Sequence, residues 1–169
     1  MPNANFSVPH PVNEKVLEYR PGSPERIELK KTLESLKAEQ VEIPCVVGGK
    51  HVFTDDTLDI RAPHSNETRL GQVHMVSSVE INEAIDKAMA VRRDWMHTDW
   101  QDRAAIFLRA AELLAGPWRA RVNAATMLCQ SKNAYQAEID AAAELVDFFR
   151  FNAAFMQQIY EDQPISTSA

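Results

Sequence analysis

The segment from Ala137 to Ala153 reads AEIDAAAELVDFFRFNA and has the periodicity of a helix. Glu144 falls about 60° from the centre of the apolar side of this helix at about 100° per residue. A carboxylate among apolar side chains needs a partner, because burying it unpaired costs several kcal/mol or forces it to take up a proton. Either Glu144 leans off the edge into water, or it meets a partner that this side faces. The predicted apolar stripe consists of Ala134, Ala137, Ala141, Leu145, Phe148, Asn152 and Met156.

Other polar and aromatic residues of this helix receive simpler interpretations. Glu138, near the edge of the stripe, is expected to be a surface or capping acid. Asn152, in its middle, is expected to be buried and paired, since a buried amide needs a hydrogen-bond partner. Phe148, Phe149 and Phe151 are expected to be core residues rather than a ligand box, because aromatic residues at helical spacing usually pack in a core.

Length, charge and cysteine content exclude several classes of protein. The 169 residues suit one domain or a part of a larger enzyme. A formal net charge of −6, without a basic stripe, argues against a nucleic-acid partner. The two cysteines, Cys45 and Cys129, have no zinc-site spacing with each other or with the histidines. We therefore expect no disulfide framework and no metal site, and a reducing compartment.

Targeting signals are not readable in the sequence. There is no run of about 18 apolar residues, so no membrane span is expected. The N-terminal stretch MPNANFSVPHPVNEK has neither a secretory apolar region nor an Arg-rich amphipathic pattern. The expected location is the cytoplasm, with the mitochondrial matrix after removal of a transit peptide as the alternative.

The first half of the chain predicts an arm, a helix and short strands. Residues 1 to about 23 are rich in proline and predict an extended arm that needs another surface to lie on. A helix follows, with Ser23 as its N-cap. The sequence GGK at 48–50 predicts a turn between two short strands, and RLGQVHMV at 69–76 predicts another strand.

The second half predicts four helices. The sequence SSVE at 77–80 is a capping box that opens the first of them. The second begins near Thr98 or Asp99 and ends at Gly116, a residue that tolerates the left-handed conformation, before Pro117. The third covers about 120–129, and the fourth runs from about 133 to 160. Short strands cannot cover so many apolar helix faces, so we expect a large exposed apolar patch and further chain beyond these residues.

Several segments resemble one family in order and at consistent spacing. They are similar to the N-terminal third of the delta-1-pyrroline-5-carboxylate dehydrogenase branch of the aldehyde dehydrogenase superfamily, from about Gly22 to Ser166. The helix that opens this section is characteristic of that branch rather than of the superfamily at large. The similar segments are GSPER (22–26), EIPCVVGGKHVFT (42–54), DRAAIFLRAAELLAGPWRARVNAATML (102–128), QAEIDAAAELVDFFRFNA (136–153) and QPIS (163–166).

The resemblance implies a fold and a division into domains. The whole enzyme would be α/β, with this chain mostly helical beside a small antiparallel sheet and an extended N-terminal arm. Residues 1–40 would form the arm and first helix. Residues 41–161 would form the N-terminal part of the NAD-binding domain, with strands at about 41–76 and helices at about 78–160. Residues 162–169 would begin a truncated oligomerisation flap, so a homo-oligomer is implied.

The resemblance also implies an activity. Members of this branch oxidise L-glutamate 5-semialdehyde to L-glutamate with NAD, the last step of proline breakdown. A cysteine thiolate attacks the aldehyde, hydride passes to the nicotinamide, and water hydrolyses the thioester. The family's nucleophile, general base, oxyanion asparagine and nucleotide-binding strands all come later than residue 169. We therefore expect no catalytic, cofactor-binding or metal-binding residue in this chain, which alone would be inactive.

One residue carries over from the family as functional. Glu144 corresponds to a glutamate at the family's substrate pocket, where a carboxylate could meet the ammonium group of the substrate or a lysine from elsewhere. Two alternatives stay open for the chain as a whole. It could belong to another semialdehyde dehydrogenase of the superfamily, or it could be a non-catalytic module that binds other subunits through its exposed helical face.

Overall fold

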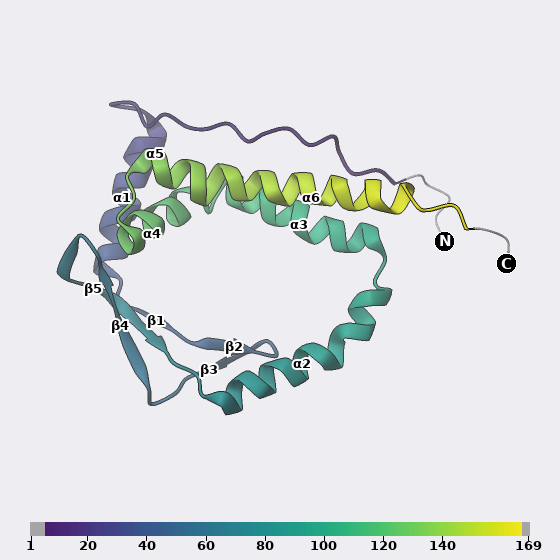
Figure 1. Cartoon of the computed structure of the whole chain (residues 1–169). Helices are drawn as coiled ribbons and strands as arrows, with labels where there is room; N and C mark the ends of the chain where they lie inside the picture. Colours follow the sequence, from purple (N-terminus) through teal and green to yellow (C-terminus); the bar gives the residue numbers. More distant parts are fainter. Residues whose placement is uncertain (1–5, 167–169) are drawn as a thin grey trace.

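A computed structural model describes residues 6–166 of the chain as a set of helices with a small amount of sheet at one end (Figure 1). The helix beginning at Ala134 is continuous to Glu161, with a π-helical stretch, η1, between α5 and α6. The elements are α1 (Pro24–Ala38), β1 (Val41–Ile43), β2 (Cys45–Val47), β3 (Lys50–Val52), β4 (Thr57–Ala62), β5 (Ser65–His74), α2 (Ser78–His97), α3 (Trp100–Ala115), α4 (Arg119–Gln130), α5 (Ala134–Ala137), η1 (Glu138–Ala143) and α6 (Glu144–Glu161).

Local signals in the sequence form the predicted structures. The side chain of Ser23 accepts a hydrogen bond from the Arg26 N–H at the start of α1. Gly48 and Gly49 both have positive φ in the turn between β2 and β3. The capping box at the start of α2 is present, with the Ser77 N–H donating to the Glu80 carboxylate. These predictions are confirmed because each depends only on residues close together in the chain.

The strands form two small sheets. The β2–β3 hairpin stands alone, and β5 lies between β1 and β4 in the other sheet. The expected antiparallel pairing holds for β2–β3 and β4–β5, whereas β1 runs parallel to β5. Gly71 permits this parallel pair, because a Cβ at that position would lie 2.0 Å from the Val41 carbonyl oxygen.

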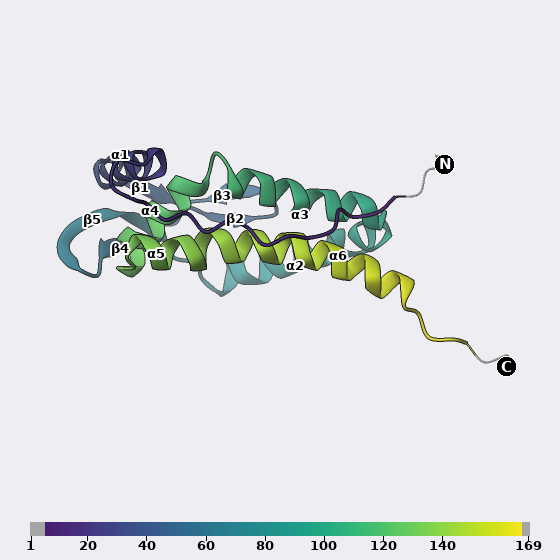
Figure 2. The same ribbon diagram turned by 90° about the horizontal axis from the view of Figure 1, so that it is seen from above.

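The helices are arranged around two packed pairs. Helices α3 and α6 lie side by side, and α1 packs on α4 near the sheet (Figures 1 and 2). Helix α2 connects the sheet to α3 and buries none of its residues. One core cluster joins α1, α4, the sheet and the arm, and the other joins α3 and α6. The first contains Tyr19, Leu29, Leu36, Ala62, Leu70, Ala124 and Leu128, and the second contains Ala111, Leu114 and Val146.

One predicted helix ending differs in detail. Helix α3 ends at Ala115, but Gly116 has φ −107° and ψ −107°, outside the left-handed region. Its N–H donates to the Glu112 carbonyl oxygen, and Pro117 follows. The stop therefore depends on the proline, which cannot continue the hydrogen-bond ladder, and not on a left-handed glycine.

The N-terminal arm lies on the helices of the same chain. From Phe6 the arm runs along α3 and α6 and reaches α1 (Figures 1 and 2). Its direction is antiparallel to the continuous helix of α5, η1 and α6 from Ala134 to Glu161, which we call the long helix. The Val8 N–H donates to the Gln157 side chain, the Glu14 N–H to Asp147, and the Leu17 N–H to Glu138, at 2.6 to 2.7 Å. The expectation that the arm needs a surface is thus confirmed for the part described; its first five residues lie outside the described range.

Within residues 6–166, none of the helices combines the length and the apolar character needed to cross a membrane.

Candidate functional site

Glu144 is the first residue of α6 and directly follows the π-helical stretch. Its N–H donates to the Ile139 carbonyl oxygen, five residues back, instead of the usual four. Its side chain is exposed, as are those of Leu145 and Phe148 beside it. We call the exposed side of the helix the open face of α6. It consists of Glu144, Leu145, Phe148, Asn152 and Phe155, all of which are exposed in the described part of the chain.

The π-helical stretch shows why the predicted stripe was wrong. A π-turn accommodates one extra residue, and each residue of an α-helix turns the chain by about 100°. From within η1 onward, the side chains that turn inward therefore lie one position later than a straight α-helix predicts. They are Ala142, Val146, Phe149 and Ala153, in place of Ala141, Leu145, Phe148 and Asn152.

This shift corrects two expectations. Asn152 is exposed rather than buried and paired. Phe148 is 56% exposed and is not a core residue, while Phe149 packs against the cluster between α3 and α6. Of the two alternatives for Glu144, the first applies in this chain, because its side chain is exposed to water.

The carboxylate that is buried is Glu138, contrary to the expectation of a surface or capping acid. Its exposed fraction is 0%. Its oxygens accept hydrogen bonds from the Leu17 N–H at 2.7 Å, the Tyr19 hydroxyl at 2.8 Å and the Asn123 amide at 2.7 Å. Arg119, also buried, forms an ion pair with it. Donors from the arm and from α4 thus satisfy a charge on η1 that would otherwise be costly to bury.

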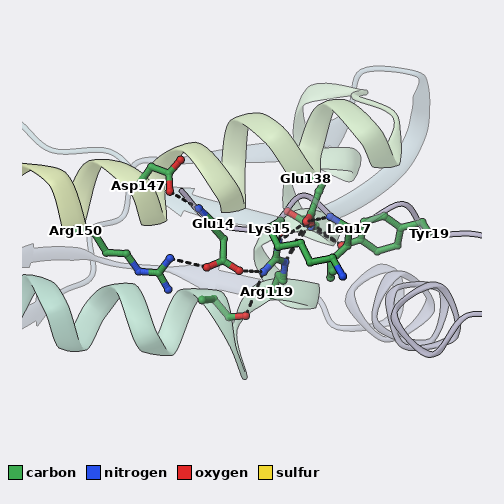
Figure 3. A network of polar contacts seen from close by, with 10 residues as sticks. Glu14, Lys15, Leu17, Tyr19, Arg119, Glu138, Asp147 and Arg150 are labelled. Atoms are coloured by element: carbon green, nitrogen blue, oxygen red, sulfur yellow. Dashed lines mark hydrogen bonds and ion pairs between the residues drawn. The ribbon is translucent and has the colours of Figure 1, made fainter. Parts of the chain in front are cut away.

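The network continues along the arm through Glu14 (Figure 3). One oxygen of Glu14 accepts from Arg119 at 2.6 Å, and the other accepts from Arg150 of α6 at 2.7 Å. The guanidinium of Arg119 also donates to the Lys15 carbonyl oxygen. Two arginines and two glutamates therefore join the arm, α4 and the long helix into one unit that we call the arm network.

Protonation equilibria reflect this arrangement. Burial opposes ionisation of Glu138, but Arg119, the Leu17 N–H and the Tyr19 hydroxyl outweigh it and hold the pKa of the carboxyl below its ordinary value. Burial, reinforced by the hydrogen bond to Glu138 and by its charge, raises the pKa of Tyr19 far above the usual range for tyrosine. Glu138 is therefore ionised and Tyr19 neutral at neutral pH, so Tyr19 is a donor to the carboxylate.

The surroundings of Glu144 are apolar. One turn along the open face, a hollow of about 260 Å³ is lined by side chains of α3 and α6. A larger hollow, about 470 Å³, lies between α1 and the start of the long helix, away from Glu144. The smaller hollow is lined by Phe107, Phe148, Phe149, Asn152, Ala153 and Met156.

In the described part of the chain, no three histidine, cysteine or acidic residues lie together as metal ligands. Cys45 and Cys129 are free thiols, and burial raises the pKa of the Cys129 thiol. The raised pKa makes the Cys129 thiol a weaker nucleophile at neutral pH.

The family of the chain follows from comparison with known proteins. The sequence profile described as "Aldehyde dehydrogenase family" matches residues 52–169. The chain belongs to the aldehyde dehydrogenase family. Among relatives of this aldehyde dehydrogenase chain, the mitochondrial delta-1-pyrroline-5-carboxylate dehydrogenase of Mus musculus is 46% identical over 91% of the chain. The Agaricus bisporus delta-1-pyrroline-5-carboxylate dehydrogenase is 42% identical over 95%. The resemblance found in the sequence is confirmed.

Solved structures of aldehyde dehydrogenases share the fold. The delta-pyrroline-5-carboxylate dehydrogenase from Mycobacterium tuberculosis, bound with NAD and cobalamin, is 48% identical over 99% of the chain, with a TM-score of 0.94. The Thermus thermophilus 1-pyrroline-5-carboxylate dehydrogenase, at 22% identity, aligns with a TM-score of 0.87, which shows the same fold. The chain spans 27% and 30% of the mouse and Agaricus relatives and 32% of the Mycobacterium chain.

Sequence reasoning missed the arm network of this aldehyde dehydrogenase segment. Tyr19, Arg119 and Asn123 were not singled out, and Glu138 was placed on the surface. A signal was nevertheless present, because Arg119 and Asn123 are four residues apart on a helix and therefore share one face. What the sequence could not supply was the carboxylate that this face meets, 15 and 19 residues further along the chain.

Proposed function

We propose that this chain forms the N-terminal part of an NAD-dependent dehydrogenase that oxidises L-glutamate 5-semialdehyde to L-glutamate in proline catabolism. The observation that carries this proposal is its 42–48% identity, over 91% of the chain or more, to relatives named for that activity. The overall reaction consumes the aldehyde, NAD⁺ and water, and yields the carboxylate, NADH and protons. Another semialdehyde dehydrogenase remains the alternative enzyme.

The chain's own contribution would be to substrate binding and not to NAD. Its five glycines include no G-x-G-x-x-G sequence, so a dinucleotide loop of that type is not supplied here. Glu144 would lie at the substrate pocket and face the ammonium group of the semialdehyde. Its exposure beside Leu145 and Phe148 supports this role, because covering that face would leave the carboxylate in an apolar setting, where an opposite charge binds strongly.

Assembly and location belong to the same proposal. The segment from residue 162 would lead into a flap through which subunits form a homo-oligomer. The compartment would be the cytoplasm, or the mitochondrial matrix; the mouse relative is mitochondrial by name. Exposed apolar side chains such as Phe155 and Ile159 on α6 favour a second candidate function, a non-catalytic module that binds other subunits.

The substitution Glu144→Ala in the complete dehydrogenase tests the pocket role. We expect kcat/KM for glutamate semialdehyde to fall about tenfold or more, the scale of one lost charged contact of roughly 1.5 to 3 kcal/mol. A semialdehyde of similar length without an amino group should be affected much less. Asp140→Ala is the matched control, because Asp140 lies one turn earlier and pairs with Lys132. Unchanged kinetics with intact folding would contradict the role.

The chain by itself provides a second test. Since the family's nucleophile and nucleotide-binding strands come later in its sequence, residues 1–169 mixed with NAD and glutamate semialdehyde should give no NADH, followed by absorbance at 340 nm. Steady turnover by this chain alone would overturn the proposed division of labour.

A further inference from the structure

The π-helical stretch places two carboxylates with opposite surroundings six residues apart. Glu138 begins η1 and is fully buried in the arm network, and Glu144 follows η1 on the open face. The helix is unbroken between them, so the orientation of one relative to the other is set by how many residues the intervening turn accommodates. An α-turn takes one residue fewer than a π-turn and would rotate Glu144 by about 100° relative to Glu138.

A π-turn persists only where surrounding contacts favour it over the α-helix, because it is the rarer form. Contacts of this kind exist at its first residue. The Glu138 carboxylate receives hydrogen bonds from Leu17, Tyr19, Asn123 and Arg119, which are held on the arm and on α4. Moving Glu138 by a fraction of a turn would break its buried ion pair with Arg119, which is more costly than losing an ordinary surface pair.

The other end of the stretch is fixed by packing. Val146 is fully buried between α3 and α6, and Ala153 is buried two turns further on. Ala142 and Ala143 are small and buried, so the wider turn fits against its neighbours. The extra residue is thus held between a polar anchor on one side and an apolar anchor on the other.

We infer that Glu138 is a positioning residue for Glu144: by holding η1 in its π-form through its own hydrogen bonds to the arm and to α4, it turns Glu144 toward the substrate. The inference rests on the proposed pocket role of Glu144. The link is direct, because the N–H of Glu144 makes a five-residue hydrogen bond to Ile139. If η1 closed into an α-helix, that N–H would bond four residues back instead and the side chain would turn.

The test uses Glu138→Gln in the complete dehydrogenase, since glutamine keeps the volume but replaces one acceptor oxygen with a donor. We expect KM for glutamate semialdehyde to rise about tenfold with kcat changed less, so that kcat/KM falls about as far as in Glu144→Ala. KM for a semialdehyde without an amino group should stay within about twofold. Glu14→Gln is the matched control: it neutralises the other carboxylate that pairs with Arg119, but Glu14 makes no hydrogen bond to η1.

Deletion of Ala141 separates positioning from mere stability. The deletion removes the extra residue, so η1 can close as an α-helix while Glu138 and Glu144 keep their present relative orientation. We expect the deletion alone to leave KM within about twofold, and to restore KM when combined with Glu138→Gln. A purely structural role for Glu138 predicts no such rescue, because the deletion does not replace its hydrogen bonds.

The outcomes divide cleanly. If Glu144→Ala raises KM but Glu138→Gln does not, or if deletion of Ala141 fails to rescue, the inference is overturned while the proposed function stands. If Glu144→Ala itself has no effect, the pocket role fails first. If Glu138→Gln does not fold, Tyr19→Phe replaces it, because this substitution removes one donor to the same carboxylate. KM is then measured for Tyr19→Phe with and without deletion of Ala141, and the same restoration of KM is expected.

Discussion

The two sides of the long helix satisfy their carboxylates in different ways. On the side under the arm, Glu138 is fully buried and takes hydrogen bonds from four residues of the same chain. On the open face, Glu144 is exposed beside the half-exposed Phe148. On the side under the arm, the partners of Glu138 all lie within the 161 residues described. The open face carries exposed apolar side chains, which is typical of a surface that another part of a protein covers. A buried charge with its partners at hand is structural, and an exposed one beside apolar side chains is a candidate for binding.

The largest expected effect on stability comes from removing Arg119 from the arm network. Arg119→Ala removes the charge that faces both Glu138 and Glu14, and it leaves the Glu138 carboxylate buried without its counter-ion. We expect the free energy of unfolding to fall by about 3 to 5 kcal/mol, measured by urea denaturation of the chain.

A control for this change lies two residues along the same helix. Arg121 pairs with Glu39 at the surface, where both side chains are about half exposed. Arg121→Ala should cost at most about 1 kcal/mol, because exposed ion pairs contribute little. Equal losses from the two substitutions would show that the arm network is no more than a surface pair.

A smaller effect is expected from paired truncations on the two faces of α6. Val146→Ala opens a cavity between α3 and α6 and should lower the free energy of unfolding by about 2 kcal/mol. Leu145→Ala, on the open face, should change it by less than about 0.5 kcal/mol. Thermal or urea unfolding followed by circular dichroism measures both. A straight α-helix through residue 140 predicts the opposite order, so this pair also tests the π-helical register.

The smallest effect is expected from pH. Because the pKa of Glu138 is lower in the folded chain than its ordinary value of about 4.3, the folded state binds fewer protons in that range. This stabilisation is fully present above the ordinary pKa and is lost as pH falls through the folded value. Unfolding free energies measured between pH 7 and pH 3 should therefore decline more steeply for the natural chain than for Glu138→Gln. Parallel curves would show that Glu138 is not held ionised by the network.

The parts of the fold that follow from the sequence are those with local causes. Ser23, Gly48 with Gly49, and the Ser77–Glu80 box act within a few residues, so each signal can be read directly. Hydropathy could not decide the register of α6 in the same way. Leu145 with Phe148 and Val146 with Phe149 are equally apolar pairs at the same spacing, and the choice between them depends on the one residue absorbed by η1.

The burial of Glu138 had a non-local cause that no periodicity contains. Its donors come from residues 17 and 19 on the arm and residues 119 and 123 on α4. A helical wheel shows only which residues share a face of one helix, so it cannot show that a carboxylate near the edge of that face will meet donors from distant segments. For Glu144 the sequence left open whether its side chain reaches water or a partner, and in this chain it is exposed.

The course of the arm also constrains the order in which this chain can fold. Its hydrogen bonds span 149 residues from Val8 to Gln157, 133 from Glu14 to Asp147 and 121 from Leu17 to Glu138. During synthesis the arm emerges before the helices on which it docks, since its partners extend to Gln157. The helices must therefore assemble before the arm closes over them, at the entropic cost of a very long loop. The arm, which precedes the helices in the sequence, therefore docks after they have formed.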